Sequence, residues 1–169
     1  ICKIVSYYLF MKLTSVFRLL PSKTVYAHCD IPCGIYDPHQ AQVAAHTIIR
    51  MTELLSLVKR EDETKAEHDI ARIVHVKEEH GHLLEEEIGT LENDYFKEEH
   101  FKQYPNLKDL LAKGVSFSIK TRQNIDMKAA EELLETIMQI AEIFYKTKGL
   151  TPFRTKSPYP TEREIVLHK

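Results

Sequence analysis

The chain has 169 residues and a mass of 19.7 kDa, enough for one ordinary domain with a single core. It is poor in glycine and lacks tryptophan, and its plentiful Leu, Ala, Glu and Lys favour helices over sheet. The net charge is −2, and without residues 1–27 it is −6, with 19 basic against 25 acidic side chains. An acidic body without a basic stripe argues against nucleic-acid binding.

Residues 1–27 have the composition of a targeting leader. They contain four basic side chains and no acidic one, and residues 11–20 are also rich in hydroxyl groups. The longest uncharged apolar run, residues 4–11, is far shorter than the roughly 20 residues of a membrane span, so no span is predicted. A leader of this kind fits import into an organelle (plastid or mitochondrion) or export. Without cleavage the protein would stay in the cytoplasm.

The leader is expected to end at Ala27. Ala27 is small, and Val25 two positions earlier is small to medium, which is the pattern that leader-processing proteases accept. Cleavage there would make His28 the first residue of the mature protein. The alternative is that residues 1–27 are a disordered or wrongly assigned extension, and under either interpretation they lie outside the fold.

The first two predicted helices follow residue 36. Asp37 can cap the free amides of the first helix, and Pro38 loses nothing at its first position by lacking an N–H. The second predicted helix is long, residues 64–96, with its apolar side chains on one face. Gly81 and Gly89 each weaken it by up to about 1 kcal/mol relative to Ala, so packing must compensate.

Two further helices complete the predicted body. The third carries its apolar stripe over residues 107–115, and the fourth begins near Asn124 or Asp126 and stops at Gly149. Four amphipathic segments with short connections predict an all-α, antiparallel up-down four-helix bundle over residues 37–149. The remaining residues, 150–169, contain three prolines and no periodicity, and we expect them to form a mobile tail.

Residues 28–36, here called the N-terminal hook, are not explained by helix packing. In this segment Cys29 and Cys33 lie four residues apart, and His28 directly precedes Cys29. The whole chain has three cysteines, which are too few for a disulfide scaffold. After cleavage behind Ala27, the His28 amine and the Cys29 amide and thiol could close two fused chelate rings around one ion. The bends at Pro32 and Gly34 would bring the Cys33 thiol to a fourth in-plane position.

A square set of nitrogen and sulfur donors favours nickel or copper over zinc, which prefers a tetrahedron. Thiolate and deprotonated amide also stabilise the higher oxidation state of the metal. The spacing alone leaves other readings open, because two cysteines separated by three residues more often form a disulfide or half of a zinc site.

The string from His28 to Pro38, H-C-D-I-P-C-G-I-Y-D-P, resembles the N-terminal signature of nickel superoxide dismutases and fills each of its fixed positions. Residues 94–97, D-Y-F-K, and the H-F-x-x-Y-P pattern at residues 100–105 resemble the end of that family's long second helix. The similarity covers residues 28–148. It implies disproportionation of superoxide to oxygen and hydrogen peroxide by one nickel ion per subunit, cycling between +2 and +3, in a homohexamer of four-helix bundles.

The resemblance also implies roles for single residues. The nickel ligands would be His28 through its amine and imidazole, Cys29 through its amide and thiol, and Cys33 through its thiol. The substrate pocket would be lined by Asp30, Pro32 and Tyr36, with Tyr95 approaching from the bundle. Lys97 would help attract the superoxide anion. The other histidines, including His39, His46, His68, His75, His82 and His100, receive no ligand role.

Two positions depart from the family pattern. A glutamate and an arginine that hold the axial imidazole in the best-described branch align with Ala44 and His80 here. We therefore expect other groups, His80 among them, to orient His28, and the rate to differ. The competing functional hypotheses are a non-catalytic nickel- or copper-binding or trafficking protein and a structural bundle with a disulfide.

Overall fold

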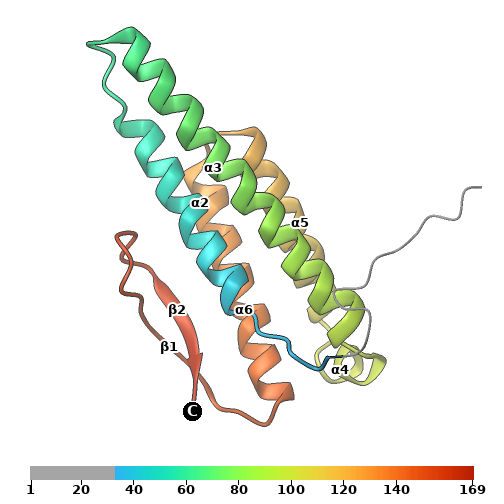
Figure 1. The fold of residues 1–169 in the computed structure, drawn as a ribbon. Helices are drawn as coiled ribbons and strands as arrows, with labels where there is room; N and C mark the ends of the chain where they lie inside the picture. The colour runs from blue at the N-terminus through green and yellow to red at the C-terminus, as the bar shows by residue number, and fades with distance from the viewer. Residues whose placement is uncertain (1–32) are drawn as a thin grey trace, which may run out of the picture. The chain divides into compact units, whose positions relative to one another are not determined.

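A computed structural model describes residues 33–169, which form a bundle of four long helices with a β-hairpin on its side (Figure 1). The helices pair in sequence order, α2 with α3, α3 with α5 and α5 with α6, and α6 packs back on α2. This confirms the predicted antiparallel four-helix bundle. The long helices are α2 (His39–Leu57), α3 (Glu63–Thr90), α5 (Leu107–Gln123) and α6 (Met127–Thr147). No helix in this part of the chain is long and apolar enough to cross a membrane.

The helix ends follow local chemistry. The backbone amide of His39 donates to Oδ1 of Asp37 at 2.8 Å, so Asp37 satisfies a free amide of α2 as predicted, but Pro38 stands at the N-cap position and not at the predicted first helical position. Asp126 stands at the N-cap of α6 and accepts from the amide of Ala129 at 3.0 Å. The predicted second helix ends instead in a π-helical turn, η1 (Leu91–Tyr95), before the short helix α4 (Glu98–Gln103).

Helix α5 continues to Gln123, well past the predicted apolar stripe. Its last two turns bury Ser118 and Thr121, which are polar and so left no hydrophobic signal. The Ser118 hydroxyl donates to the carbonyl of Gly81 at 3.1 Å. Lys77 is also buried, and its Nζ donates to the carbonyls of Thr121 and Asn124, each at 2.7 Å. Burial lowers the pKa of Lys77, and these bonds satisfy the carbonyl end of α5.

Two glycines allow the helices to approach closely. A Cβ on Gly114 of α5 would lie 2.7 Å from Cδ1 of Ile88, and a Cβ on Gly81 of α3 would lie 2.3 Å from Cδ of Arg122. Both contacts join α3 to α5. The close packing of α3 against α5 at Gly81 offsets the loss of helix stability that a glycine causes inside a helix.

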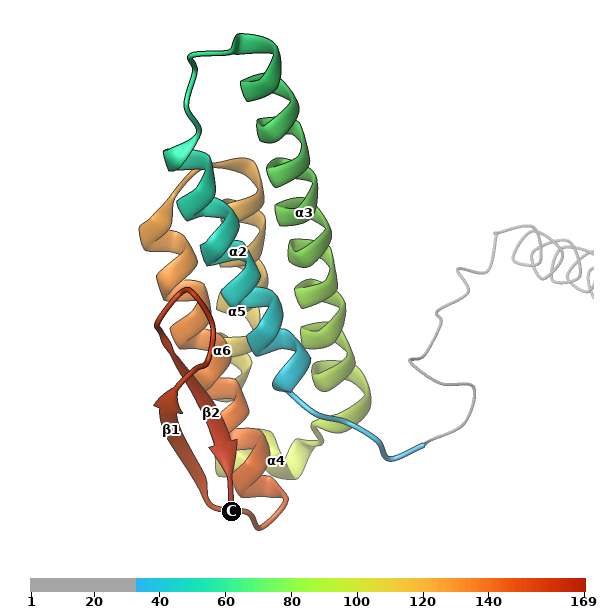
Figure 2. The same cartoon turned by 60° about the vertical axis from the view of Figure 1, so that its left-hand side comes forward.

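The expectation of a mobile tail over residues 150–169 is wrong. This segment forms an antiparallel hairpin of β1 (Pro152–Lys156) and β2 (Glu164–His168), with Phe153 opposite Leu167. Figure 2 shows it beside α2 and α6, with the C-terminus at the end of the bundle where α2 begins. Pro152 opens a strand, where a missing N–H is tolerated, and the other two prolines lie in the connection.

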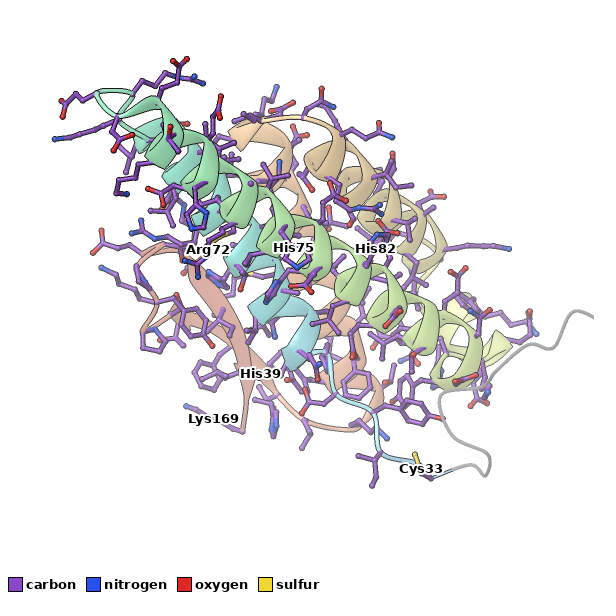
Figure 3. All side chains as sticks on the ribbon, turned by 45° about the horizontal axis from the view of Figure 1, so that its top comes forward. Cys33, His39, Arg72, His75, His82 and Lys169 are labelled. Carbon is purple, nitrogen blue, oxygen red and sulfur yellow. The ribbon has the colours of Figure 1, made fainter. Side chains whose placement is uncertain are left out.

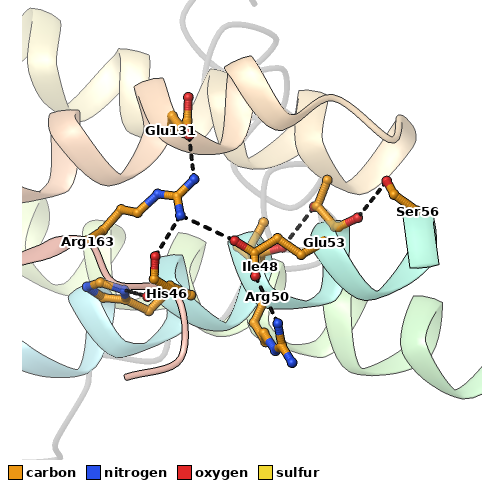
Figure 4. Close-up of polar contacts among 9 residues, drawn as sticks. His46, Ile48, Arg50, Glu53, Ser56, Glu131 and Arg163 are labelled. Atoms are coloured by element: carbon orange, nitrogen blue, oxygen red, sulfur yellow. Dashed lines mark hydrogen bonds and ion pairs between the residues drawn. The ribbon is translucent and has the colours of Figure 1, made fainter. Parts of the chain in front are cut away.

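Polar contacts hold this hairpin on the helices (Figure 4). Arg163 donates to Glu131 of α6 at 2.7 Å and to Glu53 of α2 at 3.3 Å. The buried ring of His46 lies 2.7 Å from the Thr161 hydroxyl through Nδ1 and 3.1 Å from the Glu164 carbonyl through Nε2. Because a carbonyl only accepts, the network assigns the proton to Nε2. The hairpin thus bridges α2 and α6.

Candidate metal centre

Cys33 lies in the extended segment that leads into α2, at one end of the bundle (Figure 3). Its Sγ accepts from the backbone amide of Ile35 at 3.5 Å. Gly34 turns the chain between them with φ of +71°, a conformation that favours glycine. The protonated thiol can also donate to the Ile35 carbonyl at 3.9 Å, and the deprotonated sulfur is the form that binds metals. Because the Ile35 N–H can stabilise that form, the surroundings of Cys33 fit a metal ligand.

Tyr36 and Tyr95 meet beside this segment, as the resemblance implied. Their ring centroids are 5.5 Å apart at an interplanar angle of 49°. Tyr95 is the last residue of η1, and its phenol oxygen lies 2.7 Å from the Thr147 hydroxyl at the end of α6. Chain segments nearly sixty residues apart thus bring two phenols together near the start of α2.

Lys97 lies two residues beyond Tyr95 and is exposed. Its Nζ donates to the Asp94 carbonyl at 2.7 Å, and its backbone amide donates to Nδ1 of His100 at 3.0 Å. The His100 ring also stacks on Tyr95, with centroids 5.7 Å apart. These bonds hold the lysine and its charge at the end of η1, where Tyr95 is the last residue.

Lys148 is a second cation near Tyr95, and no pattern in the sequence singled it out. Its Nζ lies 4.7 Å from the ring centroid of Tyr95 and 5.6 Å from that of Phe144, within cation–π range. In the sequence it is an ordinary lysine at a helix end. The available signal was the aromatic residue four positions earlier, which shares its helix face.

Asp37 joins the hook to α6. Besides the His39 amide, its Oδ1 accepts from the Tyr145 phenol at 3.2 Å. Burial and the charge of Asp37 raise the pKa of Tyr145, so the phenol remains a donor in neutral solution.

The two departures from the family pattern have clear structural positions. Ala44 is fully buried in α2 and has no polar side-chain group. His80 is half-buried on α3, and its Nδ1 lies 2.8 Å from the Val76 carbonyl of the same helix. An orienting role of His80 toward His28 stays a prediction.

The remaining site residues, His28, Cys29, Asp30 and Pro32, lie outside the described residues. Within residues 33–169, no three His, Cys, Asp or Glu side chains gather as a metal site. Figure 3 places His75 and His82 along α3, away from Cys33. One thiol cannot hold a metal alone, so a centre at Cys33 needs the donors expected from the hook.

Comparison with known proteins gives one consistent result. The family model for nickel-containing superoxide dismutase matches residues 23–148. A superoxide dismutase [Ni] from Streptomyces coelicolor is 34% identical over 128 residues, which cover 76% of this chain and 93% of that protein, and one from Streptomyces seoulensis matches equally.

A solved structure of native nickel superoxide dismutase is similar throughout the bundle. It superimposes with a TM-score of 0.65 at 31% identity, covering 72% of this chain and 99% of that one. The predictions of the family, the enzyme class and the nickel cofactor are confirmed, and a non-catalytic metal-binding protein is not favoured. The chain belongs to the nickel-containing superoxide dismutase family.

Proposed function

We propose that the nickel ion of this superoxide dismutase is held by His28, Cys29 and Cys33, after cleavage between Ala27 and His28. The support is the donor chemistry of the hook and the Ile35 amide aimed at the Cys33 sulfur. When bound, nickel would supply a one-electron shuttle that takes an electron from one superoxide and gives it to the next. The other groups of the site act on the substrate and its protons.

The two tyrosines are suited to binding the substrate. Superoxide is a small anion, and a neutral phenol can donate a hydrogen bond to it. Forming hydrogen peroxide also consumes two protons, so donors close to the bound anion assist the reaction. The Tyr95 phenol donates to the Thr147 hydroxyl, because the proton of that hydroxyl goes to the Phe144 carbonyl at 2.6 Å, and Tyr36 packs against the Tyr95 ring. Tyr95 would exchange this bond for one to superoxide. Asp30 would complete this pocket from the hook.

Lys97 and Lys148 provide local attraction for the anion. A mature body of net charge −6 repels superoxide at long range, whereas two ammonium groups near the end of η1 reverse the field locally. Such steering raises the association rate and weakens as salt is added.

Three further features belong to this proposal. A leader-processing protease would release the active N-terminus, so the 169-residue chain is a proenzyme. The leader would direct it to a plastid, a mitochondrion or the exterior. The mature subunits would assemble as a homohexamer, which light scattering of the processed protein would measure.

The ligand assignment is tested by Cys29→Ser and Cys33→Ser in the processed protein. Each variant should lose nickel and superoxide decay while keeping the helical far-ultraviolet circular dichroism. Ile35→Val is the matched control, because Ile35 is 77% exposed in the same segment and should keep full activity. Loss of helicity in the serine variants would instead assign the cysteines a structural role. A serine variant with normal nickel content would refute the ligand assignment.

A further inference from the structure

The C-terminal hairpin lies beyond the family match, which ends at residue 148. It is nevertheless an ordered part of the fold, with Ile165 and Val166 of β2 buried. Its contacts reach the segment that carries Cys33.

The first contact fixes the hairpin to α2 just after the hook. The Gln42 side chain is fully buried and forms two bonds with the backbone of Val166. Its Nε2 donates to the Val166 carbonyl at 3.1 Å, and its Oε1 accepts from the Val166 amide at 2.7 Å. The side-chain amide thus pairs with the edge of β2 as a further strand would.

The second contact fixes the hairpin to α6. Arg154 of β1 donates to Glu135 at 2.7 and 2.9 Å and to Glu142 at 2.7 Å. Together with the Gln42 pairing, these bonds hold the start of α2 and the part of α6 between Glu135 and Glu142 in one arrangement.

Tyr145 connects this arrangement to the hook. Its side chain is 3% exposed, and its ring centroid lies 4.6 Å from that of His168, the last residue of β2. On its other side, the phenol donates to Oδ1 of Asp37 at 3.2 Å. The hairpin, Tyr145 and Asp37 therefore form a continuous series of contacts that ends four residues from Cys33.

We propose that the C-terminal hairpin positions the metal-binding segment, and that Tyr145 is the positioning residue that links His168 of β2 to Asp37 at the base of the hook. Its relevance to nickel rests on the proposed ligand role of Cys33. The hydrogen bond itself does not, since neither Tyr145 nor Asp37 is a proposed ligand. Tyr145 acts through Asp37 and the backbone and has no contact with substrate in this account.

The test is amide hydrogen exchange of the full 169-residue chain without nickel. Tyr145→Phe keeps the ring against His168 but removes the hydroxyl. Because the lost bond is charge-assisted and lies at a partly exposed site, the amides of Ile35 and His39, which donate to Cys33 and Asp37, should exchange roughly fivefold to tenfold faster. The matched control is Tyr159→Phe, which removes a phenol hydroxyl from the hairpin connection and should leave these amides unchanged.

A second variant, His168→Ala, keeps the hydroxyl and removes the ring that packs on Tyr145. It should accelerate the same amides in the same direction. Amides of the buried part of α5 report on the whole fold. Unchanged exchange of the Ile35 and His39 amides in Tyr145→Phe, or equal acceleration in α5, would overturn the proposal. Since neither nickel nor cleavage enters this measurement, a wrong ligand assignment would not affect it.

Discussion

Replacing Gln42 with Leu tests how much the hairpin contributes to the fold. Leucine has nearly the same volume and suits a helix, but it cannot bond the Val166 backbone. The two bonds it removes are 2.7 and 3.1 Å long, and both Gln42 and Val166 are fully buried. The substitution therefore leaves one amide and one carbonyl of β2 without their partner in a site that excludes water.

The expected cost follows from that geometry. A buried backbone group deprived of its partner costs about 1–3 kcal/mol, so two cost roughly 2–6 kcal/mol. Removing a buried polar side chain returns part of this, because the glutamine amide no longer needs desolvation. We expect a net loss of about 3 kcal/mol, which corresponds to a melting point lower by roughly 6–12 °C for a chain of this size.

Urea unfolding of the nickel-free chain, followed by far-ultraviolet circular dichroism, measures this loss. Gln40→Leu is the matched control, since Gln40 is an exposed glutamine of the same helix and its replacement should change stability by less than about 0.5 kcal/mol. Equal stability of the two variants would refute the reasoning that the hairpin is held by buried pairing with α2.

Three other predictions follow from single contacts. Gly114→Ala places a methyl group 2.7 Å from an isoleucine of α3 and should destabilise by about 1–2 kcal/mol, whereas Gly89→Ala, whose nearest atom would be at 3.9 Å, should stabilise by up to about 1 kcal/mol. The midpoint of urea unfolding measures both changes in stability. A shift of the midpoint in the same direction for both variants would contradict the prediction. Burial lowers the pKa of His46 below 6.5, so its contribution to stability is complete above pH 6.5 and is lost as the pH falls through the lower folded value. His46→Gln should therefore reduce the fall in urea midpoint between about pH 7.5 and pH 5, and an unchanged fall would exclude His46 as its source. Lys148→Gln should lower kcat/KM for superoxide about twofold to fivefold at low salt and less at high salt, with Lys146→Gln near the wild-type value. A salt-independent loss would argue against steering.

The helices could be predicted from the sequence because each one is marked by apolar residues at regular spacing within a short stretch of chain. Apolar side chains at helical spacing marked all four, and Asp37 and Asp126 marked two of the starts. The end of α5 was missed because Ser118 and Thr121 face the interior there, where they bond backbone carbonyls. A hydrophobic pattern cannot register buried hydroxyl groups.

The hairpin was missed for a different reason. Its strands have five residues each, too few for a clear alternation, and its anchors lie more than a hundred residues away in Gln42 and His46. On α2 these two side chains look like ordinary polar residues. Their role appears only when the fold brings β2 beside them.

The candidate site also combines residues that a local sequence motif marked with residues whose importance depends on distant contacts. The tyrosine pair was expected through the resemblance to the family, and the structure brings Tyr36 and Tyr95 together. The ligand roles of the hook stay a prediction, because His28 and Cys29 lie outside the described residues. Lys148 and Tyr145 were missed because each is a common residue at a helix end. The partners that give them significance, Tyr95 and Asp37, come from other segments.

The role of the His28 amine is decided by superoxide decay with nickel in excess, compared between a protein that begins at His28 and one that retains Ala27. We expect rapid decay with the first protein and none above the nickel-only background with the second, because a peptide bond at His28 removes its amine as a ligand. Equal activity of the two proteins would contradict the claim that the nickel site forms only from the processed N-terminus.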